Sequence, residues 1–204
     1  MAKALRGVHP NTFTWFSLAA AILGGYAWYM SGPGEPGVYL LMAGWAALII
    51  NSVLDLLDGK VATMTGKASP KGDYLDHAID RFSDAAFLIG LGFSAWARLE
   101  IAVFALVFTL LTSYLGTQAQ AVGIGRNYGG LLGRADRMVL LIIVPLVEYF
   151  SHLYGWAYLP DRIGWASSYI ELTLWYFAAV GLLTTAQRFI GGLGAFDADG
   201  QLKE

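Results

Sequence analysis

Six stretches of mostly apolar residues, each about as long as a membrane-spanning helix, constrain the fold of this chain more than any other feature. A helix needs roughly 20 such residues to cross the hydrocarbon of a bilayer. Only 14% of the 204 residues are charged, against about 25% in ordinary globular chains, which excludes a plain water-soluble enzyme. The stretches cover residues 13–30, 37–57, 76–97, 101–124, 138–159 and 166–190.

We therefore expect an all-α integral membrane protein with six transmembrane helices, forming a single domain over residues 1–204 with a mobile tail from about residue 191. If both termini share one side of the membrane, eleven of the thirteen Lys and Arg residues lie on that side, among them Lys3, Arg6 and Arg126. Arg98 and Arg162 fall on the opposite side. Because basic residues favour the cytoplasmic side, we predict a cell-membrane protein with both termini in the cytoplasm.

Carboxylates are concentrated where the second and third stretches approach each other. Six of the fifteen acidic residues lie between positions 55 and 84. Two of them are three residues apart, and the other four follow at spacings of three, four and four, so each set shares one helix face. A charge inside the membrane costs at least about 2.5 to 3.5 kcal/mol, so such a cluster predicts a functional site. The six are Asp55, Asp58, Asp73, Asp76, Asp80 and Asp84.

The repulsion between clustered carboxylates must be relieved by protons or by a divalent cation. An all-oxygen ligand set in a chain without Cys favours a hard ion such as Mg²⁺, Mn²⁺ or Ca²⁺. A cation or proton carrier could use the same residues, and a non-catalytic scaffold is a third possibility. The glycines at 59, 66 and 72 and three nearby lysines favour phosphate chemistry, because glycine lets a backbone approach a ligand closely and lysine attracts phosphate.

The spacing of these residues resembles a family signature. The chain reads Asp55-x2-Asp58-Gly59-x2-Ala62-Thr63-x8-Gly72-x3-Asp76-x3-Asp80, similar to D-x2-D-G-x2-A-R-x8-G-x3-D-x3-D of the CDP-alcohol phosphatidyltransferase family. Thr63, in place of Arg, is the single departure. The sequence Pro10-Asn11-x-x-Thr14 also resembles the opening of that family's first membrane helix.

The resemblance implies transfer of a phosphatidyl-type group from a CDP-lipid, either CDP-diacylglycerol or CDP-archaeol, to the hydroxyl of a polar alcohol, with release of CMP. It places the active site between the second and third helices, facing the cytoplasm, and implies a homodimer. A two-metal site for Mg²⁺ or Mn²⁺ would be formed by Asp55, Asp58, Asp76 and Asp80, and Asp80 is the candidate general base. The CDP group would contact Asp58, Gly59, Ala62, Thr63, Gly72 and Asp76.

Thr63 removes the family's contact to the diphosphate, and we expect Lys60 or Lys67 to replace it. His77 lies beside the carboxylates, where we expect a supporting role rather than metal ligation.

Two segments in the second half of the chain, Gly129-Gly130-Leu131-Leu132-Gly133-Arg134-Ala135-Asp136-Arg137 and Gln187-Arg188, resemble regions of phosphatidylinositol phosphate synthases. In that subfamily the arginines that match Arg137 and Arg188 bind the phosphate of inositol phosphate, and Arg134 is a further candidate. A phosphate-binding Lys of the bacterial enzymes is replaced here by Gly116, with Gln118 and Gln120 close by. Inositol phosphate and glycerol phosphate therefore both stay open as acceptors.

Overall fold

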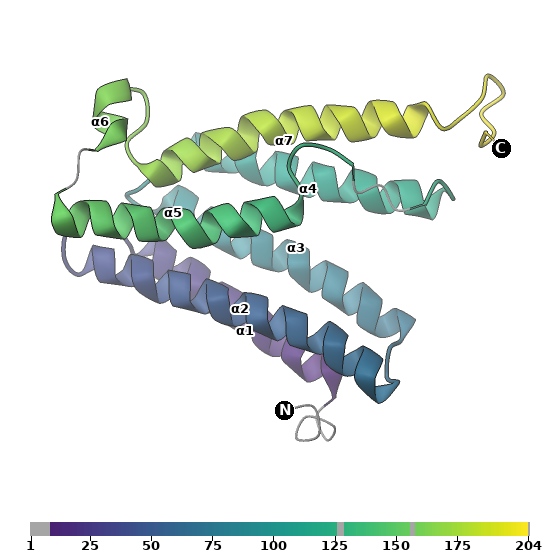
Figure 1. Ribbon diagram of the computed structural model, residues 1–204, viewed down its shortest axis with the longest axis horizontal. Coiled ribbons are helices and arrows are strands. Elements are labelled where there is room, and N and C mark those ends of the chain that lie inside the picture. Colours follow the sequence, from purple (N-terminus) through teal and green to yellow (C-terminus); the bar gives the residue numbers. More distant parts are fainter. Residues whose placement is uncertain (1–8, 126–128, 156–157, 204) are drawn as a thin grey trace.

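The computed structural model describes residues 9–125, 129–155 and 158–203, and the positions predicted at Lys3, Arg6 and Arg126 lie outside them. Six long helices run side by side, with one short helix between the last two (Figure 1). The helices are α1 (Pro10–Tyr29), α2 (Gly37–Thr65), α3 (Pro70–Phe93), α4 (Leu99–Ala121), α5 (Arg134–Tyr154), α6 (Leu159–Ile163) and α7 (Tyr169–Leu193). The prediction of an all-α protein with six long helices is confirmed.

Four of the helices, α2, α4, α5 and α7, are long and apolar enough to cross a membrane by length and composition alone, among the residues described. Helix α3 is also long, with 24 residues, but it carries the acidic stripe, which lowers its hydropathy. The start of α1, the connection between α2 and α3, and the end of α7 all lie at one end of the bundle (Figure 1). We call this end the site end.

Several helix boundaries differ from the predicted ones, mostly at the site end. Helix α2 continues to Thr65, well beyond residue 57, and α3 begins at Pro70 rather than at residue 76. Helix α5 begins at Arg134 rather than at residue 138. Apolarity marks the part of a helix inside hydrocarbon, so the polar ends of these helices were missed. The region predicted as a tail begins inside α7, and from Ala195 the chain folds back through a bond from Lys203 N to Ala195 O of 3.0 Å.

Small residues let the first three helices pack closely. A side chain added at Gly25 in α1 would meet the backbone of Ala86 in α3, and one added at Gly90 would meet the backbone of Gly25. In membrane proteins such residues permit the close helix approach that stabilises packing, because lipid leaves little hydrophobic driving force.

A buried amide joins the same three helices nearer to the site end. Asn51 of α2 donates from Nδ2 to the carbonyl oxygen of Ser17 in α1 at 2.9 Å and to Oγ of Ser83 in α3 at 3.3 Å. All three residues are buried. Polar contacts of this kind hold helices in register inside a membrane, so they determine how α2 and α3 face each other.

The opposite end of the bundle is closed by two fully buried glutamates. Glu148 of α5 accepts a hydrogen bond at 2.8 Å from the backbone nitrogen of Tyr169, at the start of α7. Glu171 of α7 pairs with Arg98, with 2.6 Å between Oε1 and Nε. A carboxylate at a helix N-terminus satisfies free backbone N–H groups, and these contacts therefore fix α7 against α4 and α5.

We predict that Gly25→Leu destabilises the helix bundle, because the new side chain must separate α1 from α3. Overpacking of this kind costs about 1 to 3 kcal/mol or more. Thermal unfolding of the detergent-solubilised protein measures the effect. Gly192→Leu is the matched control, since a Cβ at that helical position meets no atom within 4 Å. Equal melting temperatures for the two variants would contradict the packing described.

Candidate active site

A short turn brings the carboxylates of α2 and α3 face to face. Helix α2 ends at Thr65 and is capped by Gly66, whose left-handed backbone (φ 65°) suits glycine. Helix α3 begins with Pro70 in its first turn, and the Ser69 hydroxyl oxygen accepts a hydrogen bond from Gly72 N at 3.2 Å. Proline at the start of a helix and a serine cap are strong N-terminal signals. The turn therefore places the last turns of α2 beside the first turns of α3.

The carboxylates form two groups that share Asp76. One ligand oxygen each from Asp55, Asp58 and Asp76 lies within 4.8 Å of the others, and the same holds for one ligand atom each of Asp76, His77 and Asp80. The four predicted metal ligands are thus brought together. His77 is closer to the centre than expected, with its ring nitrogens 3.4 Å from Asp73 Oδ1 and 3.7 Å from Asp76 Oδ2.

The donor atoms suit a hard divalent cation. Three carboxylate oxygens within 4.8 Å of one another match the ligands that Mg²⁺ and Mn²⁺ prefer. Asp58 and Asp80 are buried, so their charges need a counter-ion. The residues present therefore fit the metal that the sequence predicts.

A cavity of about 200 Å³ lies on one side of Asp76, between α1, α2 and α3. All six residues predicted to contact CDP line it, together with Pro10, Asn11 and Thr14 of the first motif. Thr14 Oγ1 donates to Asp58 Oδ2 at 2.7 Å, so the α1 motif orients a candidate metal ligand. A Cβ at Gly59 meets no atom within 4 Å, which leaves space at this wall for a ligand.

The segment around Gly59 is helical, whereas the sequence placed it at a helix end followed by a loop. Thr63 donates its hydroxyl to the carbonyl oxygen of Gly59 at 2.9 Å, as a threonine does one turn along a helix. The loop itself spans only residues 66–69. Of the two lysines considered, Lys67 lines the small cavity, whereas Lys60 is exposed and is absent from its walls.

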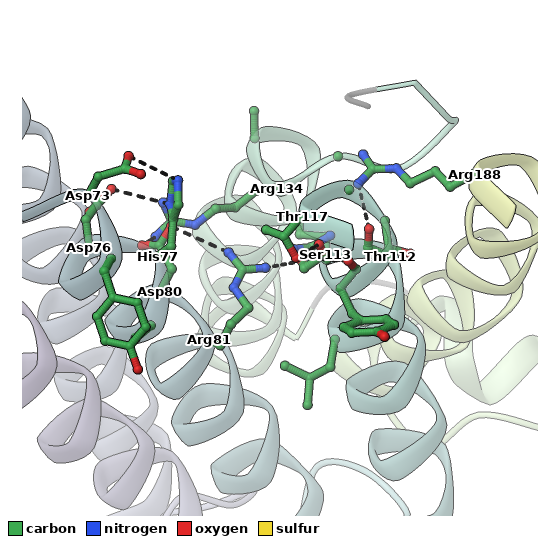
Figure 2. A pocket seen from close by; sticks show the side chains of 18 of the residues that line it. Asp73, Asp76, His77, Asp80, Arg81, Thr112, Ser113, Thr117, Arg134 and Arg188 are labelled. Atoms are coloured by element: carbon green, nitrogen blue, oxygen red, sulfur yellow. Dashed lines mark hydrogen bonds and ion pairs between the residues drawn. The ribbon is translucent and has the colours of Figure 1, made fainter. Parts of the chain in front are cut away.

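A larger cavity of about 1000 Å³ lies on the other side of Asp76, between α3, α4, α5 and α7 (Figure 2). The three predicted phosphate-binding arginines, Arg134, Arg137 and Arg188, all line it. Gly116 also lies in the wall, whereas Gln118 and Gln120 do not. Neither glutamine therefore takes the place in the wall of the Lys that the family resemblance implies at position 116.

The arginines differ in what they contact. Arg188 donates to the carbonyl oxygens of Thr112 at 2.6 Å and Gly129 at 2.8 Å. Arg137 is buried and lies 3.4 Å from Asp84 Oδ2. Within the described residues Arg188 forms no ion pair, so its charge is available to a ligand.

Arg81 is a cavity residue that the sequence analysis did not single out. Its guanidinium lies 3.4 Å from Asp84 Oδ2 and 3.5 Å from Asp80 Oδ2, and it donates to the Ser113 hydroxyl across the cavity wall (Figure 2). The i, i+3 spacing of Arg81 and Asp84 was a readable signal for an ion pair. The contact to Ser113 was not, because it depends on how α4 packs on α3.

The two cavities share Asp73 and Asp76 in their walls. Ligands in the two cavities would therefore meet at the carboxylate centre. A membrane helix bundle with two such cavities and a metal-compatible carboxylate centre between them has the form of a two-substrate transferase.

Comparison with known proteins identifies the family of this chain. The model of the CDP-alcohol phosphatidyltransferase family matches residues 7–175, and the chain therefore belongs to that family of enzymes. An archaetidylinositol phosphate synthase of Pyrococcus horikoshii is 28% identical over 81% of this chain and 87% of its own length. A phosphatidylinositol phosphate synthase of Mycobacteroides abscessus is 30% identical over 92% of this chain and 80% of its own length.

Solved structures share the fold. The crystal structure of Mycobacterium tuberculosis phosphatidylinositol phosphate synthase with CDP-DAG bound superimposes with a TM-score of 0.73 at 23% identity, covering 94% of this chain and 90% of the other. A second structure of that enzyme, in complex with manganese and citrate, gives 0.74 at 24% identity, covering 94% and 87%. The chain is accordingly a multi-pass integral membrane protein.

We predict that Asp76→Asn weakens Mn²⁺ binding by about 100-fold or more, because Asp76 belongs to both ligand groups. Electron paramagnetic resonance of free and bound Mn²⁺ measures the affinity. Asp73→Asn is the matched control on the same helix face, since the Asp73 side chain is 69% exposed and belongs to neither group. Equal losses in the two variants would argue against a centre at Asp76.

Proposed function

We propose that this enzyme transfers a phosphatidyl-type group from a CDP-lipid to a hydroxyl of inositol phosphate and releases CMP. The observation that carries the proposal is the meeting of two cavities at Asp76, one lined by the family signature and the other by arginines. Family membership favours this transfer over the cation carrier that the carboxylates alone left open.

The small cavity supports a site for the CDP group. It is lined by the signature residues Gly59, Ala62 and Gly72, whose small size leaves the space beside the carboxylates open. Lys67 supplies the cation that Thr63 cannot, and it contributes the one positive charge among the residues that line this cavity. A lysine at this edge attracts the diphosphate of the nucleotide.

Asp55, Asp58, Asp76 and Asp80 would hold the divalent cations. Bound there, Mg²⁺ or Mn²⁺ would neutralise the diphosphate and stabilise the CMP leaving group. Thr14 keeps one oxygen of Asp58 oriented by its hydrogen bond, and this fixes the ligand before substrate arrives.

Asp80 would accept the proton of the acceptor hydroxyl. It lines the large cavity and lies one helical turn after Asp76, which lines both cavities. The hydroxyl oxygen forms a bond to the β-phosphorus of the CDP-lipid, and the bond from that phosphorus to the oxygen of CMP breaks. The hydroxyl proton passes to the Asp80 carboxylate, and CMP leaves with the bonding electron pair. Positioned carboxylates perform this general-base step in many enzymes.

The large cavity supports an acceptor that carries a phosphate. Arg188 and Arg137 line one region of its wall, and guanidinium groups bind phosphate oxygens in pairs. The relatives named above are an archaetidylinositol phosphate synthase and a phosphatidylinositol phosphate synthase by name, which favours inositol phosphate over glycerol phosphate as the acceptor.

We propose further that the site end faces the cytoplasm, with both termini on that side. The cations of α2, α3, α5 and α7 support this orientation, since Arg98 and Arg162 are placed at the opposite end. The homodimer implied by the family resemblance stays a prediction.

We predict that the purified enzyme releases CMP in a metal-dependent reaction when it receives a CDP-lipid, Mn²⁺ and inositol 1-phosphate. With a glycerol phosphate in place of inositol 1-phosphate, we expect less CMP release. Parallel reactions with CDP-diacylglycerol and CDP-archaeol identify the lipid.

Asp80→Asn should lower turnover by about 100- to 10,000-fold through loss of the base. Asp199→Asn, an exposed carboxylate near the C-terminus, is the control expected to keep full activity. No CMP from the unaltered enzyme with any acceptor would refute the proposal.

We predict that Lys67→Ala raises the KM for the CDP-lipid by about 10-fold, the value of one charge-assisted hydrogen bond, and leaves the KM for the acceptor nearly unchanged. Lys60→Ala is the matched control, because Lys60 does not line the cavity. Thr63→Arg in the Lys67→Ala background should restore the affinity by supplying the cation from the family position. An unaltered KM in Lys67→Ala would assign the diphosphate contact elsewhere.

A further inference from the structure

Arg134 bridges the two helices that carry the carboxylates. From the first turn of α5, its Nη1 lies 3.1 Å from Asp55 Oδ2 on α2, and its Nη2 lies 2.5 Å from Asp80 Oδ1 on α3. Figure 2 shows its side chain reaching toward the carboxylates of α3. One guanidinium thus contacts both carboxylates; among the described residues Asp55 pairs with no other cation, whereas Asp80 also lies 3.5 Å from Arg81 of its own helix.

Each of these two carboxylates belongs to a different candidate metal-ligand group. Asp55 stands in the group with Asp58 and Asp76, and Asp80 in the group with Asp76 and His77. A divalent cation and a guanidinium at the same carboxylates repel each other strongly in a low-dielectric site. Arg134 in this position therefore competes with the metal for both groups.

The position of Arg134 also leaves one of its donors unsatisfied. Among the described residues its buried Nε has no hydrogen-bond partner; Nη1 donates to Asp55, whereas Nη2 and Asp80 Oδ1 form an ion pair without hydrogen-bond geometry. A buried donor without a partner is unfavourable, and it favours a second arrangement of the side chain. Arg134 lines the large cavity, so the open space available to it is the proposed acceptor site.

The other arginines of that cavity already have partners. Arg81 and Arg137 share Asp84, each at 3.4 Å, Arg81 also lies 3.5 Å from Asp80 Oδ2, and Arg188 is held by backbone carbonyl oxygens. The positive charge of the cavity can therefore increase most by release of Arg134 from Asp55 and Asp80.

We propose that Arg134 is an exchangeable counter-ion that couples the metal site to the acceptor site. It neutralises Asp55 and Asp80 before metal binds, and metal binding displaces it into the large cavity, where it adds its charge to the phosphate-binding wall. Metal and acceptor phosphate consequently bind with positive cooperativity, and each strengthens the other by the same factor. This inference rests on the proposed function of the two cavities.

The test is the Mn²⁺ affinity of the full-length protein in detergent, measured by electron paramagnetic resonance without substrates. Arg134→Gln should bind Mn²⁺ about 10-fold more tightly than the unaltered protein, within the usual range of such couplings. Arg188→Gln removes the same charge from the same cavity but touches no carboxylate, so its effect should be much smaller. Arg134→Lys keeps the positive charge but lacks a guanidinium that can contact both Asp55 and Asp80. We expect its Mn²⁺ affinity to lie between those of the unaltered protein and Arg134→Gln.

Calorimetry with inositol 1-phosphate measures the coupling itself. Saturating Mg²⁺ should raise the affinity of the unaltered protein for this ligand, and the increase should be smaller in Arg134→Gln than in Arg188→Gln. Equal Mn²⁺ affinities in Arg134→Gln and Arg188→Gln would overturn the inference while leaving the proposed function intact. If the unaltered protein bound no Mn²⁺ at all, the proposed function itself would fail.

Discussion

The cost of placing carboxylates at the end of a membrane helix bundle governs the rest of this structure. Asp58, Asp80 and Asp84 are buried, and an unpaired charge in such surroundings is strongly unfavourable. Side chains of the neighbouring helices offset this cost. Thr14 of α1 donates a hydrogen bond to Asp58, and Arg134 of α5 forms an ion pair with Asp80. Helices α1 and α5 are therefore tied to the carboxylate cluster through polar side chains, and these contacts stabilise both the fold and the cluster.

The same contacts explain why the site has two compartments. Asp76 lies between the groups, and the signature of α2 and α3 lines one cavity while α4, α5 and α7 complete the other. A two-substrate reaction at phosphorus needs the nucleotide and the acceptor on opposite sides of the reacting atom. Under the proposed function, the two cavities on either side of Asp76 give this arrangement, and close packing at Gly25 and Gly90 holds α1 against α3.

The departures from the family pattern at Thr63 and Gly116 fall where the resemblance implies contacts to phosphate. Thr63 bonds to the backbone of its own helix, which leaves Lys67 as the cation of the small cavity. Gly116 leaves the large cavity to its arginines, among them Arg81, which reaches Ser113 across the wall. Lys67 keeps a positive charge in the wall of the small cavity, and the arginines keep several in the wall of the large one. Recognition of phosphate tolerates such shifts, because it depends on charge and donors rather than on one side-chain identity.

The sequence by itself determined the class of fold, the carboxylate cluster and the reaction type. Hydrophobic length, the spacing of Asp55 to Asp80 and the match to a family signature are local properties that can be read along the chain. The tertiary structure alone decided which lysine lines the small cavity, that Arg81 lines the large cavity, and that Arg134 bridges Asp55 and Asp80. These are contacts between helices far apart in the chain, and they depend on how α5 and α4 pack against α2 and α3. Helix periodicity fixes the face on which a side chain lies, but the partner on that face is set by packing.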